Sequence, residues 1–325
     1  MYHYMSIRKF YLTFKSQENF RSILIKMADI KGFTTIEVAR LCRVSDATVK
    51  RWEEAGVLKS ERTSGGHRRF RAEEVARFQR EQGLGLKQSH GDESVKRTTN
   101  RVRDNKIYSN STLLQSLIDG GEEAATNFLI TAHLEGKPLT EIIDRHICPA
   151  MQEIGELWHR EEISVTQEHL ATRTVMAAIY KLRNALPIPE MKNKLAICCA
   201  MEGDLHELPT LLAQIAVENE GFEVINFGAA TPLYCMADEV VRHSPDFVCI
   251  SATVINDLER LTRDYKDFRE KIANLKIPVL LGGRVFKDEN LRKRFKSEFY
   301  ARSFTDVAEF ARNLNNNQNN LVRSI

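Results

Sequence analysis

Two short stretches of the sequence carry side chains that can surround a ligand or bind a metal. The first, WHREEISVTQEH, places Trp158 and His159 ahead of Glu168 and His169. Most of this stretch is too polar for a core helix, and a large aromatic, two imidazoles and a carboxylate suit a pocket. The alternative is a helix–helix corner in which the tryptophan packs and the polar groups are solvated.

The second stretch, MEGDLHELP, places Asp204 two positions before His206. A carboxylate that accepts one imidazole N–H fixes the tautomer and leaves the other ring nitrogen free for a metal. Further along, ISATV supplies Ser251 and Thr253, and LLGGRV supplies Gly282 and Gly283. Two adjacent glycines let the backbone come close to a large flat ligand.

The elements expected around the second stretch bring these residues together. Four short β-rich runs (KLAICCAM, FEVINFG, DFVCISATV and IPVLLGG) alternate with helical segments, which predicts a parallel sheet over residues 189–314. Ligands of such sheets bind outside the carboxyl ends of the strands. The Asp-x-His pair follows the first run, the hydroxyls the third and the glycines the fourth, so all three groups should meet at one edge.

The first stretch lies in a segment, 109–188, whose apolar residues follow helical spacing and predict a small helix bundle. Ser164 with Gln167 matches a capping box, so a helix should end before Ile163 and a new one begin after it. Trp158 and His159 then lie near one helix end, and Glu168 and His169 lie in the next first turn. Two such ends can face one pocket.

Residues 31–83 form a compact, locally basic block. Thr34 with Glu37 predicts a helix start, and Ser45 can cap a second helix after a tight turn. A Gly65–Gly66 hairpin with several cations follows, which is typical of a wing that contacts phosphates. Trp52 is expected to pack the helices rather than contact a base, and the alternative for the cations is a solvated charged face. The candidate DNA-contacting residues are Ser45, Thr48, Lys50, Arg51, Arg62, His67, Arg68 and Arg69.

The remaining segments and the bulk composition set limits. Residues 1–30 are expected to be an extension, with Met27 as an alternative start, residues 84–108 a flexible linker, and residues 315–325 a disordered tail. The net charge of +3 is small, and the six cysteines form no C-x-x-C pair. No apolar run reaches the roughly 18 residues of a membrane span. We therefore expect a cytoplasmic protein, and the fold class is multidomain α plus α/β.

The first block resembles the winged helix-turn-helix of MerR-type transcription regulators, through TIEVARLCRVSDATVKRWEEAGVL and RTSGGHRRF. The resemblance implies binding to double-stranded promoter DNA as an oligomer. Because a polar linker replaces the long dimerising helix that many members carry, oligomerisation would have to come from the C-terminal part.

The last block resembles the cobalamin-binding domain that methionine synthase shares with the mutases, through D-x-H, S-x-T and G-G. This resemblance implies that His206 is the lower axial ligand of cobalt, with the nucleotide tail beside the hydroxyls and glycines. The family motif usually ends in glycine, as D-x-H-x-x-G, whereas this chain has Pro209 there. Proline fits the first turn of a helix, but its fixed φ can reshape the loop.

The whole arrangement resembles the light-sensing adenosylcobalamin regulators of the CarH and LitR type. By that resemblance Trp158 packs on the adenosyl group, Glu168 and His169 complete its pocket, and His159 takes the upper cobalt position after illumination. The implied function is a light-responsive repressor, not an enzyme, which is a tetramer on DNA in the dark and dissociates to monomers or dimers in light.

Two alternatives remain at this stage. One is a MerR-type regulator that does not bind cobalamin and senses another signal, which Pro209 supports. The other is a corrinoid carrier or enzyme, which is disfavoured because no substrate barrel of about 250 residues is present.

Overall fold

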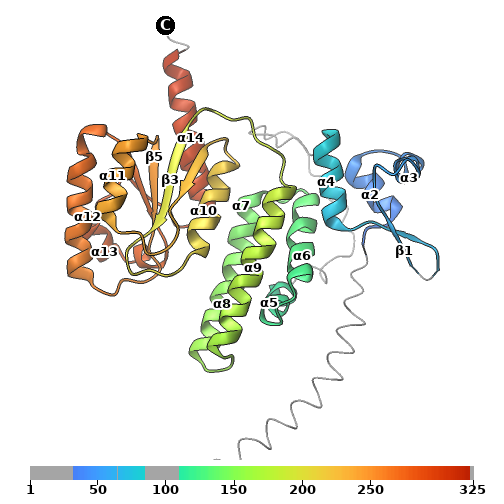
Figure 1. Ribbon diagram of the computed structural model, residues 1–325, viewed down its shortest axis with the longest axis horizontal. Helices are drawn as coiled ribbons and strands as arrows, with labels where there is room; N and C mark the ends of the chain where they lie inside the picture. The colour runs from blue at the N-terminus through green and yellow to red at the C-terminus, as the bar shows by residue number, and fades with distance from the viewer. Residues whose placement is uncertain (1–31, 64, 85–109, 323–325) are drawn as a thin grey trace, which may run out of the picture.

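The computed structural model describes residues 32–63, 65–84 and 110–322, with side chains described only to residue 314 at the C-terminal end (Figure 1). The expected extension and nearly all of the expected linker therefore lie outside the described residues. Three parts follow one another along the chain: a small basic head, a helix bundle and a domain built on a parallel sheet. The predicted fold class is confirmed.

The head begins with α2 (Thr35–Cys42), whose start carries the predicted capping box. Glu37 N–H donates to the Thr34 hydroxyl, and Thr34 N–H donates to the Glu37 carboxylate. Ser45 caps α3 (Asp46–Glu54), and β1 (Glu61–Arg62) pairs with β2 (Arg68–Arg69) as the wing. The helix α4 (Ala72–Gln82) closes the head. Trp52 packs against Phe78 with 4.7 Å between ring centroids, so it has the expected packing role.

The bundle comprises α5 (Asn110–Ile118), α6 (Glu122–Leu134), α7 (Leu139–Ile142), α8 (Cys148–His159) and α9 (Val165–Ala185). A π-helical turn, η1 (Ile143–Ile147), joins α7 to α8. The apolar faces of these helices bury a continuous core that includes Leu129, Ile143 and Val175.

The head packs directly on the bundle, with α4 lying beside α6 and α9 (Figure 1). Lys181 of α9 lies 3.1 Å from Glu122 and 3.6 Å from Glu73, and Arg71 lies 3.2 Å from Glu123. Arg80 also donates a hydrogen bond to the carbonyl of Asn184. The composition of the polar linker did not predict that the head packs on the bundle.

The third part is a five-stranded parallel sheet with the order β4-β3-β5-β6-β7. Its strands are β3 (Leu195–Ala200), β4 (Glu223–Asn226), β5 (Phe247–Ser251), β6 (Val279–Gly282) and β7 (Phe299–Tyr300). The first four are the predicted runs, and β7 is an additional two-residue strand. The strand order reverses between β3 and β5, which is where open α/β sheets bind ligands.

Helices cover both faces of the sheet, so the strands are buried on both sides. One face is covered by α11 (Leu233–His243) and α12 (Leu258–Ile272), and the other by α10 (Leu208–Glu218) and α14 (Phe304–Val322). The short elements η2 (Ala273–Leu275), η3 (Arg284–Lys287) and α13 (Glu289–Arg294) complete the connections.

The backbone of α14 is helical as far as Val322, although the sequence predicts a disordered tail from residue 315. Once the packed first part of a helix has formed, each further residue adds one backbone hydrogen bond at little nucleation cost. The helix can therefore continue into the polar, asparagine-rich sequence.

Candidate functional site

The loop after β3 is organised around the buried carboxylate of Asp204. Its Oδ1 lies 2.6 Å from Nδ1 of His206 and accepts the His206 backbone N–H at 3.1 Å. Its Oδ2 accepts the backbone N–H of Thr253 at 2.5 Å, which ties the loop to the end of β5. Asp204 has no exposed surface, whereas about half of the His206 side chain is exposed. The predicted Asp-x-His pair is therefore formed, and Nε2 of His206 is left for an external partner.

The charges in this loop stabilise one another. Burial raises the pKa of the Asp204 carboxyl, but the hydrogen bonds from His206 and from the Thr253 N–H outweigh it, so the pKa is lowered. The hydrogen bond to Asp204 raises the pKa of His206 against the opposing effect of burial, and the Glu168 carboxylate raises it further. A carboxylate that holds an imidazole in this way is the usual outer partner of a metal-binding histidine.

The ends of β5 and β6 form the second side of the site. Ser251 and Gly282 are paired across the two strands. The Ser251 hydroxyl is buried and has no hydrogen-bond partner among the described residues. Because buried polar groups are normally satisfied, this hydroxyl calls for a ligand atom or a water.

Gly283 allows the backbone to pass closely beside β5. Its φ is +103°, and a Cβ at this position would lie 2.4 Å from the carbonyl oxygen of Ala252. Beside it, a hollow of about 460 Å³ is lined in part by Thr253, Val254 and Arg284. The hydroxyl, the glycine and the hollow thus lie together at the carboxyl edge of the sheet.

Several apolar side chains are exposed around this edge. Leu205 is 80% exposed and Tyr234 is 69% exposed, and Phe227 and Val254 are also solvent-accessible. Leu205 stands between Asp204 and His206 in an otherwise polar loop, and an apolar residue at such a position is a signal that the sequence itself carries. An exposed apolar patch around a polar centre is typical of a ligand face.

The bundle contributes the turn between α8 and α9. As predicted, α8 ends at His159, and Ser164 forms a capping box with Gln167 at the start of α9. Trp158 is 43% exposed, and its ring centroid lies 5.0 Å from that of His159. Trp158 is therefore exposed at this corner rather than buried in it.

The same turn carries the second predicted pair. In the first turn of α9, His169 Nε2 lies 3.7 Å from the Glu168 carboxylate, and the Thr172 hydroxyl donates to Glu168 at 2.9 Å. The strand ends and the α8–α9 turn point to the same side of the molecule (Figure 1). The Glu168 carboxylate of the bundle also contributes to the raised pKa of His206.

Asp144, in the π-helical turn, is a residue that the sequence analysis missed. Its carboxylate accepts the backbone N–H groups of Phe304 and Thr305 at 2.8 and 2.9 Å, and the Thr305 hydroxyl at 2.8 Å. It thereby caps α14 from the neighbouring domain and fixes the bundle against the sheet. No local sequence pattern predicts a helix cap whose two partners are about 160 residues apart.

The predicted DNA-binding residues of the head differ in how firmly neighbouring side chains hold them. Arg68 is held by Glu53 at 2.9 Å and by Glu54 at 3.4 Å, and Arg62 also contacts Glu53. Lys50 pairs with Asp46 at 3.2 Å. The Ser45 hydroxyl caps α3 by accepting the Thr48 backbone N–H and lies 2.9 Å from the Thr48 hydroxyl, to which Arg51 donates at 3.3 Å. His67 is exposed and Arg69 is partly exposed, so the wing tip is the more open part.

The domains themselves match known families. Residues 34–70 match the MerR family regulatory proteins, and residues 110–183 and 195–307 match two families that are each described as a B12 binding domain. The chain has a MerR N-terminal domain followed by B12-binding domains. Both predicted domain resemblances are thus confirmed.

Relatives share either this whole architecture or its C-terminal part. The chain is 23% identical over 268 residues to the HTH-type transcriptional repressor CarH of Myxococcus xanthus, covering 75% of this chain and 86% of the relative. It is 24% identical over 202 residues to the methionine synthase of Mycobacterium tuberculosis, but that match spans only 16% of the enzyme.

Among solved structures, the monomethylamine corrinoid protein of Methanosarcina barkeri covers 65% of this chain with a TM-score of 0.54 and 18% identity. The match includes all of that protein, so the likeness establishes the fold of the C-terminal part. Within the part of the chain that the structure describes, no helix is long and apolar enough to cross a membrane. Together, the domains support a cobalamin-dependent regulator.

Proposed function

We propose that this protein is a light-responsive transcriptional repressor that holds adenosylcobalamin between the helix bundle and the parallel sheet. The observation that carries the proposal is the Asp204–His206 pair at the strand-order reversal, with the α8–α9 turn of the bundle on the same side of the molecule (Figure 1). The MerR domain in the same chain supports a regulator rather than an enzyme or a corrinoid carrier.

Each side of the site has a distinct part in holding the cofactor. His206 would bind the metal through Nε2, since Asp204 occupies Nδ1. The unpartnered Ser251 hydroxyl and the close backbone at Gly283 would accept the nucleotide tail, with Thr253 and Gly282 beside them. Adenosylcobalamin, when bound, supplies a visible chromophore with a carbon–cobalt bond that light can break.

The bundle residues would sense whether the adenosyl group is present. Trp158 offers its exposed ring as a packing surface, and Glu168 and His169 offer hydrogen-bonding groups from the start of α9. His159, adjacent to Trp158, would take the upper position after illumination. The loss of the Trp158 packing would then release the bundle from the sheet.

The DNA-binding part would act in the cytoplasm on promoter DNA. We propose a dark tetramer, in which several heads engage one operator, because linked binding sites raise affinity through effective concentration. Dissociation to monomers or dimers in light would remove this gain and lift repression. The repressor sign is taken from the CarH relative.

The decisive experiment is a visible absorption spectrum of the full chain with adenosylcobalamin, in the dark and after green light, with the oligomer size followed by light scattering. We expect a bound chromophore whose spectrum changes as a dark tetramer dissociates. An unchanged oligomer after complete photolysis would contradict the light switch, while leaving cobalamin binding intact.

Two substitutions test the assignments. His206→Ala should remove lower ligation and its spectral signature, whereas His243→Ala, on α11 and paired with Glu239, is the matched control. Trp158→Ala should weaken the dark tetramer with a limited effect on folding, because the side chain is 43% exposed. Wild-type assembly of the Trp158 variant would remove this residue from the sensing role.

A second candidate, a regulator that senses another signal, is favoured by Pro209. This proline lies in the first turn of α10, where its missing N–H is not needed, so the helix itself is undisturbed. If the wild-type chain does not bind cobalamin but Pro209→Gly does, the proline closes the tail channel and the second candidate holds.

A further inference from the structure

The loop of residues 202–207, between β3 and α10, carries the Asp204–His206 pair but makes little apolar contact of its own. Leu205, its one apolar side chain, is 80% exposed, and His206 is also exposed. The helix α10 begins after Glu207 without a side-chain cap. The direction of the His206 imidazole therefore depends on polar contacts that other segments make with this loop.

The segment between β5 and α12, with the first turn of α12, makes those contacts. The Asn256 side-chain amide donates to the Gly203 carbonyl at 3.2 Å. Arg260, in the first turn of α12, donates to the Glu202 carboxylate. With the bond from the Thr253 N–H described above, three consecutive residues of the loop are each tied to this one segment.

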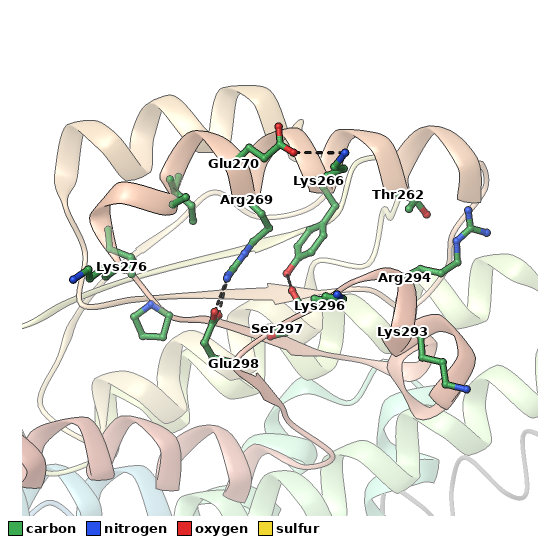
Figure 2. Close-up of a pocket in the computed structure, with 15 residues that line it drawn as sticks. Thr262, Lys266, Arg269, Glu270, Lys276, Lys293, Arg294, Lys296, Ser297 and Glu298 are labelled. Carbon is green, nitrogen blue, oxygen red and sulfur yellow. Dashed lines mark hydrogen bonds and ion pairs between the residues drawn. The ribbon is translucent and has the colours of Figure 1, made fainter.

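This segment is a fixed frame for the loop. Asp257 caps α12 by accepting the Arg260 N–H at 3.0 Å, and Phe268 of the same helix is buried in the core. At the far end of α12, Arg269 donates at 2.8 Å to Glu298, which directly precedes β7 (Figure 2). Because α12 is anchored at both ends, the frame holds the loop and not the reverse.

The hydrogen bond to Gly203 acts on His206 through Asp204. Gly203 has φ +83°, in the left-handed region that glycine adopts freely, so its backbone does not fix the next peptide group by itself. Asn256 bonds the peptide group before Asp204, and the Ala230 N–H bonds the Asp204 carbonyl at 2.8 Å. Because both peptide groups are held, the carboxylate can keep Nδ1 of His206 at 2.6 Å and leave Nε2 in one direction.

We infer that Asn256 and Arg260 are positioning residues, which hold the loop so that His206 directs Nε2 toward a metal. The inference rests on the proposed function, in which that nitrogen binds cobalt. Neither residue needs to touch the cofactor, since both act through Glu202 and Gly203. Asn256 should have the larger effect, because exposed ion pairs such as that of Arg260 contribute little.

The first test needs no cofactor and measures amide hydrogen exchange in the full-length protein. Asn256→Asp keeps the size of the side chain but places an acceptor against a backbone carbonyl, and a carboxylate just before α12 does not disfavour that helix. The amides of His206 and Thr253, which both donate to Asp204, should exchange about fivefold faster, because the loop loses one hydrogen bond. The amide of Ile197, in β3, should exchange as in the wild type.

The second test reports the metal bond itself. Cob(II)alamin is added to full-length protein whose histidines carry a nitrogen isotope, and electron paramagnetic resonance measures the splitting from a coordinated histidine nitrogen. Asn256→Asp should still bind the corrinoid, but the ratio of histidine-coordinated to uncoordinated cobalt should fall about fivefold. His206→Ala gives the baseline without this ligand. A purely structural role for Asn256 would leave the ratio unchanged in the folded protein.

Variants of Arg260 supply the rescue and the control. Arg260→Ala should shift both readouts in the same direction but by less, and Arg260→Lys, which keeps the charge opposite Glu202, should recover most of the change. Arg263→Ala, about one turn further along α12, is the matched control, because Arg263 pairs with Asp264 of its own helix. This variant should behave as the wild type does.

Unchanged exchange at His206 and Thr253 in Asn256→Asp would overturn the inference. Faster exchange with full histidine coordination would also overturn it, as would an equal effect of Arg263→Ala. A wild type that binds no corrinoid would overturn the proposed function and the metal-directing role together. In that case faster exchange in Asn256→Asp would still show that the frame holds the imidazole, so the two failures can be told apart.

Discussion

At the scale of single residues, the candidate site depends on two kinds of feature, one chemical and one steric. Asp204 is fully buried and binds both His206 and the backbone at the end of β5. The imidazole is therefore oriented before any ligand binds. Gly283 provides the close backbone approach beside it. The first feature was predictable from the sequence as Asp-x-His, because its partners are two residues apart.

The adjacent glycines offer a direct test of the steric feature. Gly283→Ala should destabilise the fold by about 1–3 kcal/mol from backbone conformation alone, with a further cost from the contact with the Ala252 carbonyl. Gly282→Ala is the matched control, since its Cβ would meet nothing closer than 3.8 Å. Urea unfolding of both variants measures the difference, and equal free energies of unfolding would contradict the close approach at Gly283.

At the scale of elements, local signals predicted local structure. The capping box of Ser164 with Gln167 placed the α8–α9 break, and apolar runs placed β3 to β6. Two contiguous residues were too few to predict β7, Phe299–Tyr300. The cap on α14 could not be predicted, because Asp144 and its partners are about 160 residues apart in the chain. Long-range polar contacts leave no periodic trace in a sequence.

This cap makes Asp144 a test of how the bundle is attached to the sheet. Asp144→Ala removes the acceptor for two backbone N–H groups and one hydroxyl, and unsatisfied buried donors cost about 1–3 kcal/mol. We expect faster hydrogen exchange at Phe304 and Thr305, while β3 and β5 remain protected. Asp144→Asn keeps one acceptor oxygen and should lie between the two. Unchanged exchange in the alanine variant would show that apolar packing alone joins the domains.

At the scale of the whole molecule, α9 reaches all three parts of the chain. Its first turn carries Glu168 beside the candidate site, and Arg183 near its end pairs with Glu218 of α10 at 2.6 Å. Lys181 binds the carboxylates of α4 and α6. At 21 residues it spans about 30 Å as one rigid element. A displacement at its first turn would therefore reach the DNA-binding head without a relay of side chains.

Reversing the charge of Lys181 tests this connection. Lys181→Glu places a third carboxylate beside Glu73 and Glu122, so the docking of the head on the bundle should weaken while both remain folded. The loss is small in energy, about 1 kcal/mol for exposed pairs, but it should raise hydrogen exchange in α4 and increase the radius of gyration in X-ray scattering. Lys181→Gln, which removes the charge without repulsion, should have a weaker effect, and Glu122→Lys in the Lys181→Glu background should restore one pair.

If the light switch works through α9, illumination should change operator affinity less in Lys181→Glu than in the wild type. An unchanged light response in a variant whose head is demonstrably released would assign the coupling to oligomer dissociation alone.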